Sequence, residues 1–457
     1  MEVHMSKQIK VALLMAASLF MEIMDGTIVT TALPSMARAM RVQSTTASLL
    51  ISSYMITVAI CIPLSGWISQ HFGQRRIWLV AVLGFTLSSL GNALAVNFIM
   101  LLLMRVLQGV FGSLMTPTAR IIVLEKTESS RLLQMTSYLI WPALVAPAIA
   151  PVAGGAILAI LDWRWIFLIN LPIGIVIWLI GTRLIDQDTN FKRSVFDVKG
   201  FLAIAIMSAT ILGSLELGTY GKRYTFIALF GIGVGIVAAI IGYRHLRYGK
   251  NVLFSLSAFS IQSFRVTQTS GVFLWLSVGA MPYLLTTFLQ NIFRWSALKA
   301  GTYVLFIFLG NISSKPFTTP MIRGLGYRKS LLIAYIAVAF SAFGLVFIMP
   351  STPAVAIWLL AAISGAARSL GLGAYNGLSF ADIPMDKRND ANTLNSVMQN
   401  LAQGMGVSFV SIIIAMSANF VAVDIAYRIC FGFLALLVLY PIIQTIRLPE
   451  SIGKSTL

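Results

Sequence analysis

The sequence has little charge and few residues of the kinds that build enzyme or metal sites. Only 11% of its 457 residues are charged, against roughly 25% in a typical soluble domain. It contains three histidines and two cysteines. Cys61 and Cys430 lie inside apolar runs without a metal or redox motif, so packing is their expected role. The pattern excludes a disulfide-rich scaffold, and we expect no enzyme activity, cofactor or metal site.

What is abundant is apolar sequence. Hydrophobic residues make up 58% of the chain and occur in runs of about 20, the length that crosses a bilayer as a helix. The runs predict an all-α polytopic membrane protein with about 14 transmembrane helices, the first of them retained rather than cleaved as a signal peptide. The expected spans are residues 11–33, 46–68, 77–96, 98–124, 133–160, 165–183, 200–217, 225–243, 266–290, 297–321, 330–349, 354–378, 391–417 and 426–446.

The basic residues indicate how the chain is oriented. The net charge of +18 comes from Lys and Arg beside apolar runs, which argues for a lipid bilayer and against a nucleic-acid partner. If the N-terminus is cytoplasmic, most of these residues fall in the even-numbered loops and the two tails, as the positive-inside rule requires. We therefore expect an inner (cytoplasmic) cell membrane, with both termini in the cytoplasm.

An internal repeat predicts the domain organisation. The segment "GQRR" after the second span begins at Gly73, and a similar "GYRK" after the tenth begins at Gly326. A six-span unit thus recurs after eight spans, a pattern typical of transporters that build a site between two halves. We expect six-helix halves at 1–185 and 266–457, separated by a linker at 186–265 that holds two additional spans and a cytoplasmic amphipathic segment.

Two acids occupy the middle of the first span. Glu22 and Asp25 are three residues apart and share one helix face. A carboxylate at that depth costs at least roughly 2.5–3.5 kcal/mol, and repulsion between the two favours protonation of at least one. A carboxyl group that takes up and releases a proton suits an antiporter driven by a proton gradient. The alternatives are a permanently protonated Glu22 and a purely structural Asp25.

A cation in the fourth span is expected to pair with one of these acids. With the N-terminus inside, Asp25 lies roughly 12 Å and Arg105 roughly 10 Å below the outer surface. An intramembrane arginine normally pairs, so we predict an Asp25–Arg105 contact, either for proton coupling or as a static ion pair. Gln108, one turn further, is a candidate substrate-binding residue.

Two segments carry a family resemblance. "MDGTIVTTALPSMA" in the first span and "DWRWIFLINLPIG" between the fifth and sixth resemble the 14-span drug:proton antiporter branch of the major facilitator superfamily. Asp25 falls on the signature acid, and Thr30 stands where the branch usually has Asn. "LLLMRVLQGVFGS" resembles the proton-coupling motif. The resemblance implies a major-facilitator fold and proton-driven export by alternating access, with Asp25 and Arg105 in the coupling. The signature does not require Glu22, which is a second candidate for proton coupling because it shares a helix face with Asp25.

The loop "GWISQHFGQRR" resembles a superfamily loop that latches one helix against its neighbour. It contains Gly66, Gly73, Arg75 and Arg76. Gln70 replaces the usual Asp, which predicts a weaker charge latch. The alternative is that the two arginines only anchor the loop on the cytoplasmic side.

The fifth span, "WPALVAPAIAPVAGG", resembles the antiporter motif of that span. Pro147 and Pro151 permit a bend, and Gly154 and Gly155 permit close helix contact, as a gate requires. Generic tight packing is the alternative.

Three further cations lie inside predicted spans. Arg120 and Lys315 are near cytoplasmic ends and are expected to snorkel to the surface. Arg368 is about halfway across and is expected to face a cavity or a partner. With Glu22 and Gln108, it completes the candidate substrate-binding residues.

The leading hypothesis is a proton-coupled exporter of amphipathic organic compounds such as drugs. Acids in one half and Arg368 in the other suit a cationic or, better, a zwitterionic substrate. The alternative is export of an anionic metabolite or metal chelator, motivated by the intramembrane cations. We expect the protein to work as a monomer, with protons, the small-molecule substrate and lipid as its partners.

Overall fold

The structure is all-helical, as the apolar runs predict. It is a computed structural model that describes residues 7–42, 44–47, 49–125, 127–128, 131–188, 195–219, 224–249, 252–295, 297–417 and 420–456. No strand occurs in this part of the chain. Long helices follow from the length of the apolar runs, because a helix satisfies every internal backbone hydrogen bond within one segment.

The helices before residue 185 make up the first group. They are α1 (Lys7–Ala39), α2 (Ser44–Ala47), α3 (Leu49–Cys61), α4 (Leu64–Phe72), α5 (Gln74–Ala93), α6 (Phe98–Glu125), α7 (Leu132–Ile160), α8 (Trp165–Leu168) and α9 (Asn170–Leu184).

Two further helices precede a second group. The two are α10 (Val198–Thr219) and α11 (Thr225–Tyr248). The second group comprises α12 (Gln262–Asn291), α13 (Ala297–Val346), α14 (Ala354–Ala381), α15 (Arg388–Ser417), α16 (Val423–Leu437) and α17 (Leu439–Ile446). Short 3-10 helices lie at Leu256–Ser260, Met385–Lys387 and Lys454–Thr456.

Two predicted spans differ in detail from the structure. The second span is broken, because α3 and α4 meet at a 58° bend next to Pro63, which has no backbone N–H to continue the helix. The tenth and eleventh spans are joined in α13, whose 50 residues are interrupted by non-helical Gly326 (φ 77°). Eleven helices of the described chain are long and apolar enough to cross a membrane, or up to twelve if the α3–α4 pair is one crossing. The count of fourteen stays a prediction.

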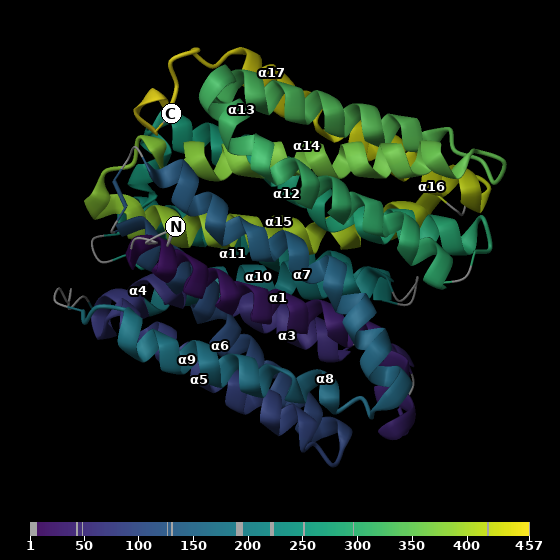
Figure 1. The fold of residues 1–457 in the computed structure, drawn as a ribbon, viewed down its shortest axis with the longest axis horizontal. Helices are drawn as coiled ribbons and strands as arrows, with labels where there is room; N and C mark the ends of the chain where they lie inside the picture. Colours follow the sequence, from purple (N-terminus) through teal and green to yellow (C-terminus); the bar gives the residue numbers. More distant parts are fainter. Residues whose placement is uncertain are drawn as a thin grey trace, which may run out of the picture.

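The two groups of helices lie on either side of α10 and α11 (Figure 1). In that view α5, α6 and α9 occupy the lower edge, and α13, α14 and α17 occupy the upper edge. Helix α10 contacts α3 of the first group and α15 of the second. The N and C ends of the chain lie at the same end of the bundle (Figure 1). The domain boundaries at 185 and 265 stay a prediction.

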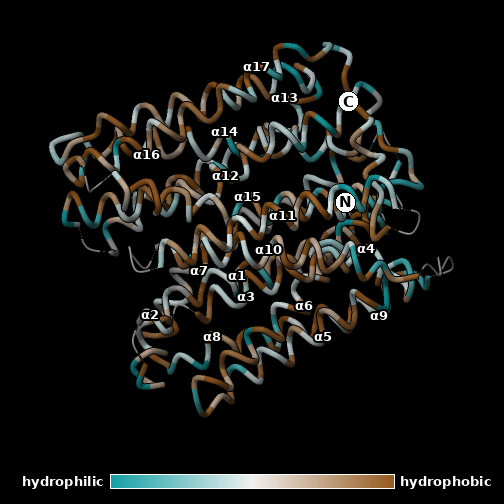
Figure 2. The backbone as a smooth tube through the Cα atoms, turned by 180° about the vertical axis from the view of Figure 1, so that it is seen from behind, coloured by the Kyte–Doolittle hydropathy of each residue, from teal (hydrophilic) through white to brown (hydrophobic). Residues whose placement is uncertain are grey.

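The outer surface of the bundle is apolar. Large hydrophobic side chains are exposed along α5, α11 and α13, among them Leu87, Phe226 and Phe340. Figure 2 shows hydrophobic colour along much of the helices and hydrophilic colour concentrated at their ends and connecting loops. So much exposed apolar area is unfavourable in water, whereas it matches the hydrocarbon core of a bilayer.

Candidate functional site

A fully buried ion pair joins α1 to α6. Arg105 Nη1 donates to Asp25 Oδ2 at 2.7 Å, and both side chains are 0% exposed. The same nitrogen donates to Gln108 Oε1 at 2.7 Å, and Arg105 Nε donates to the Leu50 carbonyl at 3.1 Å. The guanidinium carbon also lies 4.5 Å from the centre of the Tyr54 ring. The predicted Asp25–Arg105 contact is confirmed.

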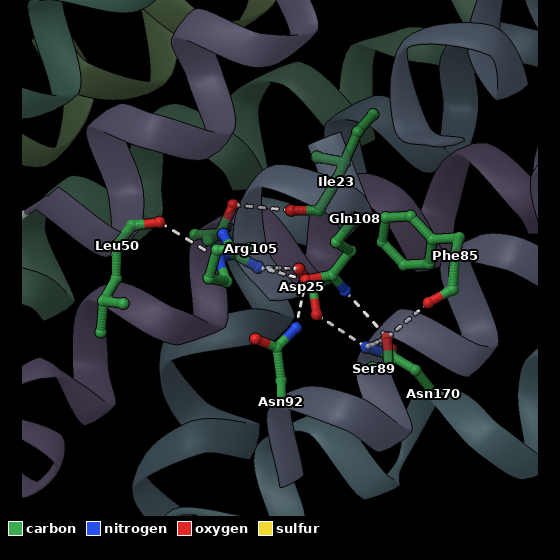
Figure 3. A network of polar contacts seen from close by, with 10 residues as sticks. Ile23, Asp25, Leu50, Phe85, Ser89, Asn92, Arg105, Gln108 and Asn170 are labelled. Atoms are coloured by element: carbon green, nitrogen blue, oxygen red, sulfur yellow. Dashed lines mark hydrogen bonds and ion pairs between the residues drawn. The ribbon is translucent and has the colours of Figure 1, made fainter. Parts of the chain in front are cut away.

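Neutral polar side chains surround this pair (Figure 3). Asn170 Nδ2 donates to Asp25 Oδ1 at 2.7 Å, so each carboxylate oxygen accepts one short hydrogen bond. Gln108 accepts from Asn92 Nδ2 at 2.9 Å and donates to Ser89 Oγ at 2.8 Å. Charge-assisted hydrogen bonds of this kind hold a buried carboxylate in one orientation. The network therefore fixes Asp25 through residues of α5, α6 and α9.

Close helix packing makes this geometry possible. A Cβ built on Gly109 of α6 would lie 3.0 Å from the Tyr54 carbonyl oxygen and 2.9 Å from Thr57 Cβ. A Cβ on Gly112 would lie 3.0 Å from Tyr54 Oη and 3.6 Å from Glu22 Oε1. Small residues on this face of α6 thus allow α1 and α3 to approach it. The Arg105 side chain can then reach Asp25 of α1 while it stays buried between the helices.

Glu22 has a different environment. Its Oε2 accepts a hydrogen bond from Thr116 Oγ1 at 2.5 Å, and the ion pairs of the described chain do not include it. The two acids of α1 therefore have separate partners, although they are one helical turn apart. Protonation of Asp25 removes the charge that attracts Arg105, whereas protonation of Glu22 breaks no ion pair.

The second group of helices contains buried cations. Arg368 of α14 is 2% exposed, and its Nη2 donates to the Ser277 carbonyl at 2.9 Å. Lys315 of α13 is 3% exposed, so the prediction that it snorkels to the surface is wrong. Its side chain points into the helix bundle, where a Cβ on Gly373 would lie 3.8 Å from its Nζ. Arg120 is partly buried, and its Nη2 donates to Gln399 Oε1 at 3.3 Å.

Direct hydrogen bonds between the two groups gather near one end of the bundle. Arg388 Nη1, at the start of α15, donates to the carbonyls of Leu124 and Thr127 at 2.7 and 3.0 Å. Asn392 Nδ2 donates to the Pro117 carbonyl at 2.9 Å. Side chains of α15 thus donate to backbone carbonyls of α6 and of the segment that follows it. These hydrogen bonds link the two groups of helices at that end.

A family model gives this architecture a name. The model described as "Major Facilitator Superfamily" matches residues 15–407. The chain belongs to the major facilitator superfamily. It is therefore a multi-pass membrane transporter, and the predicted superfamily and all-α membrane fold are confirmed, while the 14-span branch stays a prediction.

Curated relatives are similar over almost the whole chain. A protein of Serratia proteamaculans (strain 568) is 30% identical over 450 residues, covering 95% of this chain and 92% of its own. One of Pectobacterium carotovorum subsp. carotovorum (strain PC1) is 30% identical over 409 residues, covering 88% and 86%. Both bear the name "Putative multidrug resistance protein MdtD".

Solved structures share the fold at low sequence identity. The human organic anion transporter MFSD10 has a TM-score of 0.69 at 15% identity and covers 96% of this chain and 100% of its own. A bacterial homologue of the iron transporter ferroportin, in an outward-facing state, has a TM-score of 0.66 at 16% identity and covers 97% and 99%. At these identities the likeness concerns the fold alone.

The loop after α4 is held by an acid from a distant part of the chain, and its role as a latch stays a prediction. Asp188, beyond α9, accepts hydrogen bonds from the Arg75 backbone N–H at 3.2 and 3.1 Å, and Arg75 Nη2 donates to the Thr182 carbonyl at 2.6 Å. Gly73 adopts a positive φ of 94°, and the site has no room for a side chain, because a Cβ there would lie 2.3 Å from Asp188 Oδ2. Arg76 is exposed.

Close helix contact is found at two of the three predicted glycines, Gly66 and Gly154. A Cβ on Gly66 would lie 2.2 Å from Thr393 Oγ1 of α15, so this glycine permits contact between the two groups. Gly154 of α7 packs against α1, because its Cβ would lie 2.9 Å from Ile28 Cγ1. Gly155 is exposed, and no atom of the described residues lies within 4 Å of a Cβ built on it, so the expected close contact is not found there.

The predicted bend of α7 and the predictions for two side chains are not tested by the structure. Helix α7 runs through Pro147 and Pro151 as one element, and the bend that they were expected to permit stays a prediction. The side chains of Pro151 and Thr30 lie outside the described residues.

Sequence reasoning missed several partners of the site. Asn170 lies within "DWRWIFLINLPIG", so the resemblance of that segment offered a signal for it. Asn92, Ser89 and Thr116 carry no comparable signal, because small polar residues are common in transmembrane helices. Gln108 uses both ends of its amide within the network, which places it beside Arg105 rather than at an unpartnered surface.

Proposed function

We propose that the protein is a proton-coupled exporter of amphipathic organic compounds. The observation that carries the proposal is the Asp25–Arg105 pair, fully buried at 2.7 Å in a transporter of this superfamily. A buried pair is weak evidence for stability, since desolvation offsets much of its attraction. An intramembrane acid that can lose its partner is instead suited to moving protons. The names of the MdtD relatives support a drug-like substrate.

The coupling step follows from competition at Asp25. A proton and the Arg105 guanidinium both stabilise the negative carboxylate, so binding of the proton weakens the ion pair. Asn170 and Gln108 can keep their neutral hydrogen bonds when the charge is lost. Protonation therefore loosens the contact between α1 and α6, and loss of the proton restores it, which links proton movement to helix movement.

Glu22 is the second acid in the proposal. It lies one turn from Asp25 and its described partner is the neutral hydroxyl of Thr116. Adjacent acids couple their titrations, so we place a second proton on Glu22. The competing role is attraction of a cationic substrate.

In an alternating-access cycle, the end of the bundle that carries the α6–α15 hydrogen bonds would be the closed one. The distribution of basic loops favours cytoplasmic chain termini, and the α6–α15 hydrogen bonds lie near the same end as the termini. We infer an outward-facing conformation, in which the cytoplasmic end is shut. A reporter fused after Leu457, or placed between residues 186 and 199, should be cytoplasmic. An external location of either reporter would contradict this orientation.

The decisive experiment uses vesicles that contain the purified protein and an imposed pH gradient. Asp25→Asn should abolish proton-driven transport while the protein still inserts and binds ligand. The matched control is Asp162→Asn, which alters an exposed acid paired with Arg164 in the same half. Undiminished transport by Asp25→Asn would remove Asp25 from the coupling role.

A second measurement separates the two roles of Glu22. If it carries a proton, Glu22→Gln should weaken transport of every substrate and lower the number of protons released per substrate. If it binds a cation, only cationic substrates should be lost and the proton ratio should stay the same. An unchanged ratio with cation-selective loss would contradict our preferred version.

A further inference from the structure

Two buried cations of the second group have no role in the proposed coupling machinery. Lys315 is 3% exposed and Arg368 is 2% exposed. Lys315 Nζ and Arg368 Nε have no hydrogen-bond partner among the described residues. Neither forms an ion pair with a described carboxylate. An intramembrane cation without a compensating partner is costly, and such residues mark substrate or ion pathways.

The two cations belong to helices α13 and α14, which pack against each other. Lys315 Nζ of α13 approaches α14 at Gly373, where a Cβ would be 3.8 Å away. Arg368 precedes Gly373 on α14 by five residues, about 1.4 helical turns, and its Nη2 donates to the Ser277 carbonyl of α12. The buried positive charge of the second group is therefore concentrated within little more than one turn of depth.

A partly buried cation of the first group, Arg120 of α6, adds positive charge at the interface with the second group. Arg120 Nη1 of α6 has no hydrogen-bond partner in the described part of the chain, while its Nη2 reaches Gln399 of α15. Asp25 is already neutralised by Arg105. Glu22 is thus the acid of α1 that has no cation partner among the described residues, whereas Arg120, Lys315 and Arg368 each have an unsatisfied N–H group and no described acid. The imbalance favours a ligand that brings negative charge.

We propose that Lys315 and Arg368 bind an acidic group of the exported compound. The transported class is then organic anions and zwitterions, with purely cationic amphiphiles disfavoured. The inference rests on the proposed export function, and it names the substrate class of that function. A bound carboxylate or sulfonate would supply the acceptors that Lys315 Nζ and Arg368 Nε lack.

The test is a binding measurement with matched fluorescent probes and no pH gradient. Dansylglycine is anionic, dansylglycinamide is neutral and dansylcadaverine is cationic, yet all share one fluorophore. Titrated into the detergent-purified full chain, dansylglycine should bind at least tenfold more tightly than the other two. Lys315→Gln and Arg368→Gln should each remove most of that preference, whereas Lys315→Arg should keep it. The control is Lys329→Gln, an exposed cation on the same helix.

The outcomes separate this inference from the proposed function. Equal affinity for the three probes, absence of binding, or an unchanged preference in both glutamine variants would overturn the anion site. Arg368→Lys and Lys315→Arg keep the test valid if a glutamine variant does not fold. Loss of pH-driven transport with the anion preference intact would refute only the proton coupling. Nε-dansyl-lysine, a zwitterion, should bind more tightly than dansylglycine if Glu22 contributes.

Discussion

The two groups of helices hold their buried charges in opposite ways. In the first, Asp25 and Arg105 neutralise each other: Arg105 donates to one carboxylate oxygen and Asn170 donates to the other. In the second, Lys315 and Arg368 are also buried, but neither pairs with an acid in the described part of the chain. A buried charge with an opposite charge beside it is stabilised by the protein alone, whereas a buried cation without an acid would be stabilised by an anionic ligand. The difference suggests that protons act in one half and substrate charge in the other.

The largest effect should come from breaking the compensated pair. Arg105→Met leaves the Asp25 carboxylate buried without its cation, and we expect a loss of about 3–5 kcal/mol in stability. The measurement is the unfolding of detergent-purified protein. The double variant Asp25→Asn/Arg105→Met should recover much of that loss, because no charge remains. A double variant as unstable as Arg105→Met would show that the pair is not the source of the effect.

A smaller loss is expected at the neutral partner of Asp25. Asn170→Ala removes the donor to Asp25 Oδ1 and should cost about 1–3 kcal/mol, the usual penalty for an unsatisfied buried group. Proton-driven transport should weaken without vanishing, since Arg105 still holds the other oxygen. Comparison with Asn97→Ala, whose side chain caps an exposed turn, controls for loss of an amide.

The uncompensated half should respond in the opposite direction. Lys315→Met removes a charge that has no partner in the described chain, so stability should be unchanged or raised by about 1 kcal/mol or more. The same variant should lose affinity for acidic ligands. Strong destabilisation by Lys315→Met would mean that this lysine has a structural role, and the contrast between the halves would fail.

The smallest effects should separate two neighbouring glycines of α7. Gly155→Ala meets open space and should stabilise the helix by roughly 0.5–1 kcal/mol. Gly154→Ala pushes a methyl group to 2.9 Å from Ile28 Cγ1 and should cost about 1–3 kcal/mol through overpacking. Thermal unfolding of the two variants measures the difference, and equal shifts would place both glycines in the same environment.

Sequence patterns alone predicted the class of protein and the contact between Asp25 and Arg105. Apolar runs of crossing length leave little alternative to membrane helices, because unpaired backbone groups are too costly in lipid. The first-span acid and the fourth-span arginine could be paired from depth alone, since a helix rises by a constant amount per residue. Helix bends were less accessible: Pro63 gave a signal for the α3–α4 break, whereas the continuity of α13 across Gly326 depends on packing.

Which polar groups contact one another depends on how the helices pack. Glu22 and Asp25 share a helix face, yet one contacts Thr116 and the other Arg105, because neighbouring helices determine the partners. Lys315 lies near a predicted span end, yet its side chain is buried against α14, since side-chain direction depends on where the next helix lies. Gln70 stands where the resemblance predicts an Asp, and the acid that contacts this loop is Asp188, which comes from a distant part of the chain. Such contacts depend on helix rotation and on three-dimensional proximity, which a one-dimensional pattern does not encode.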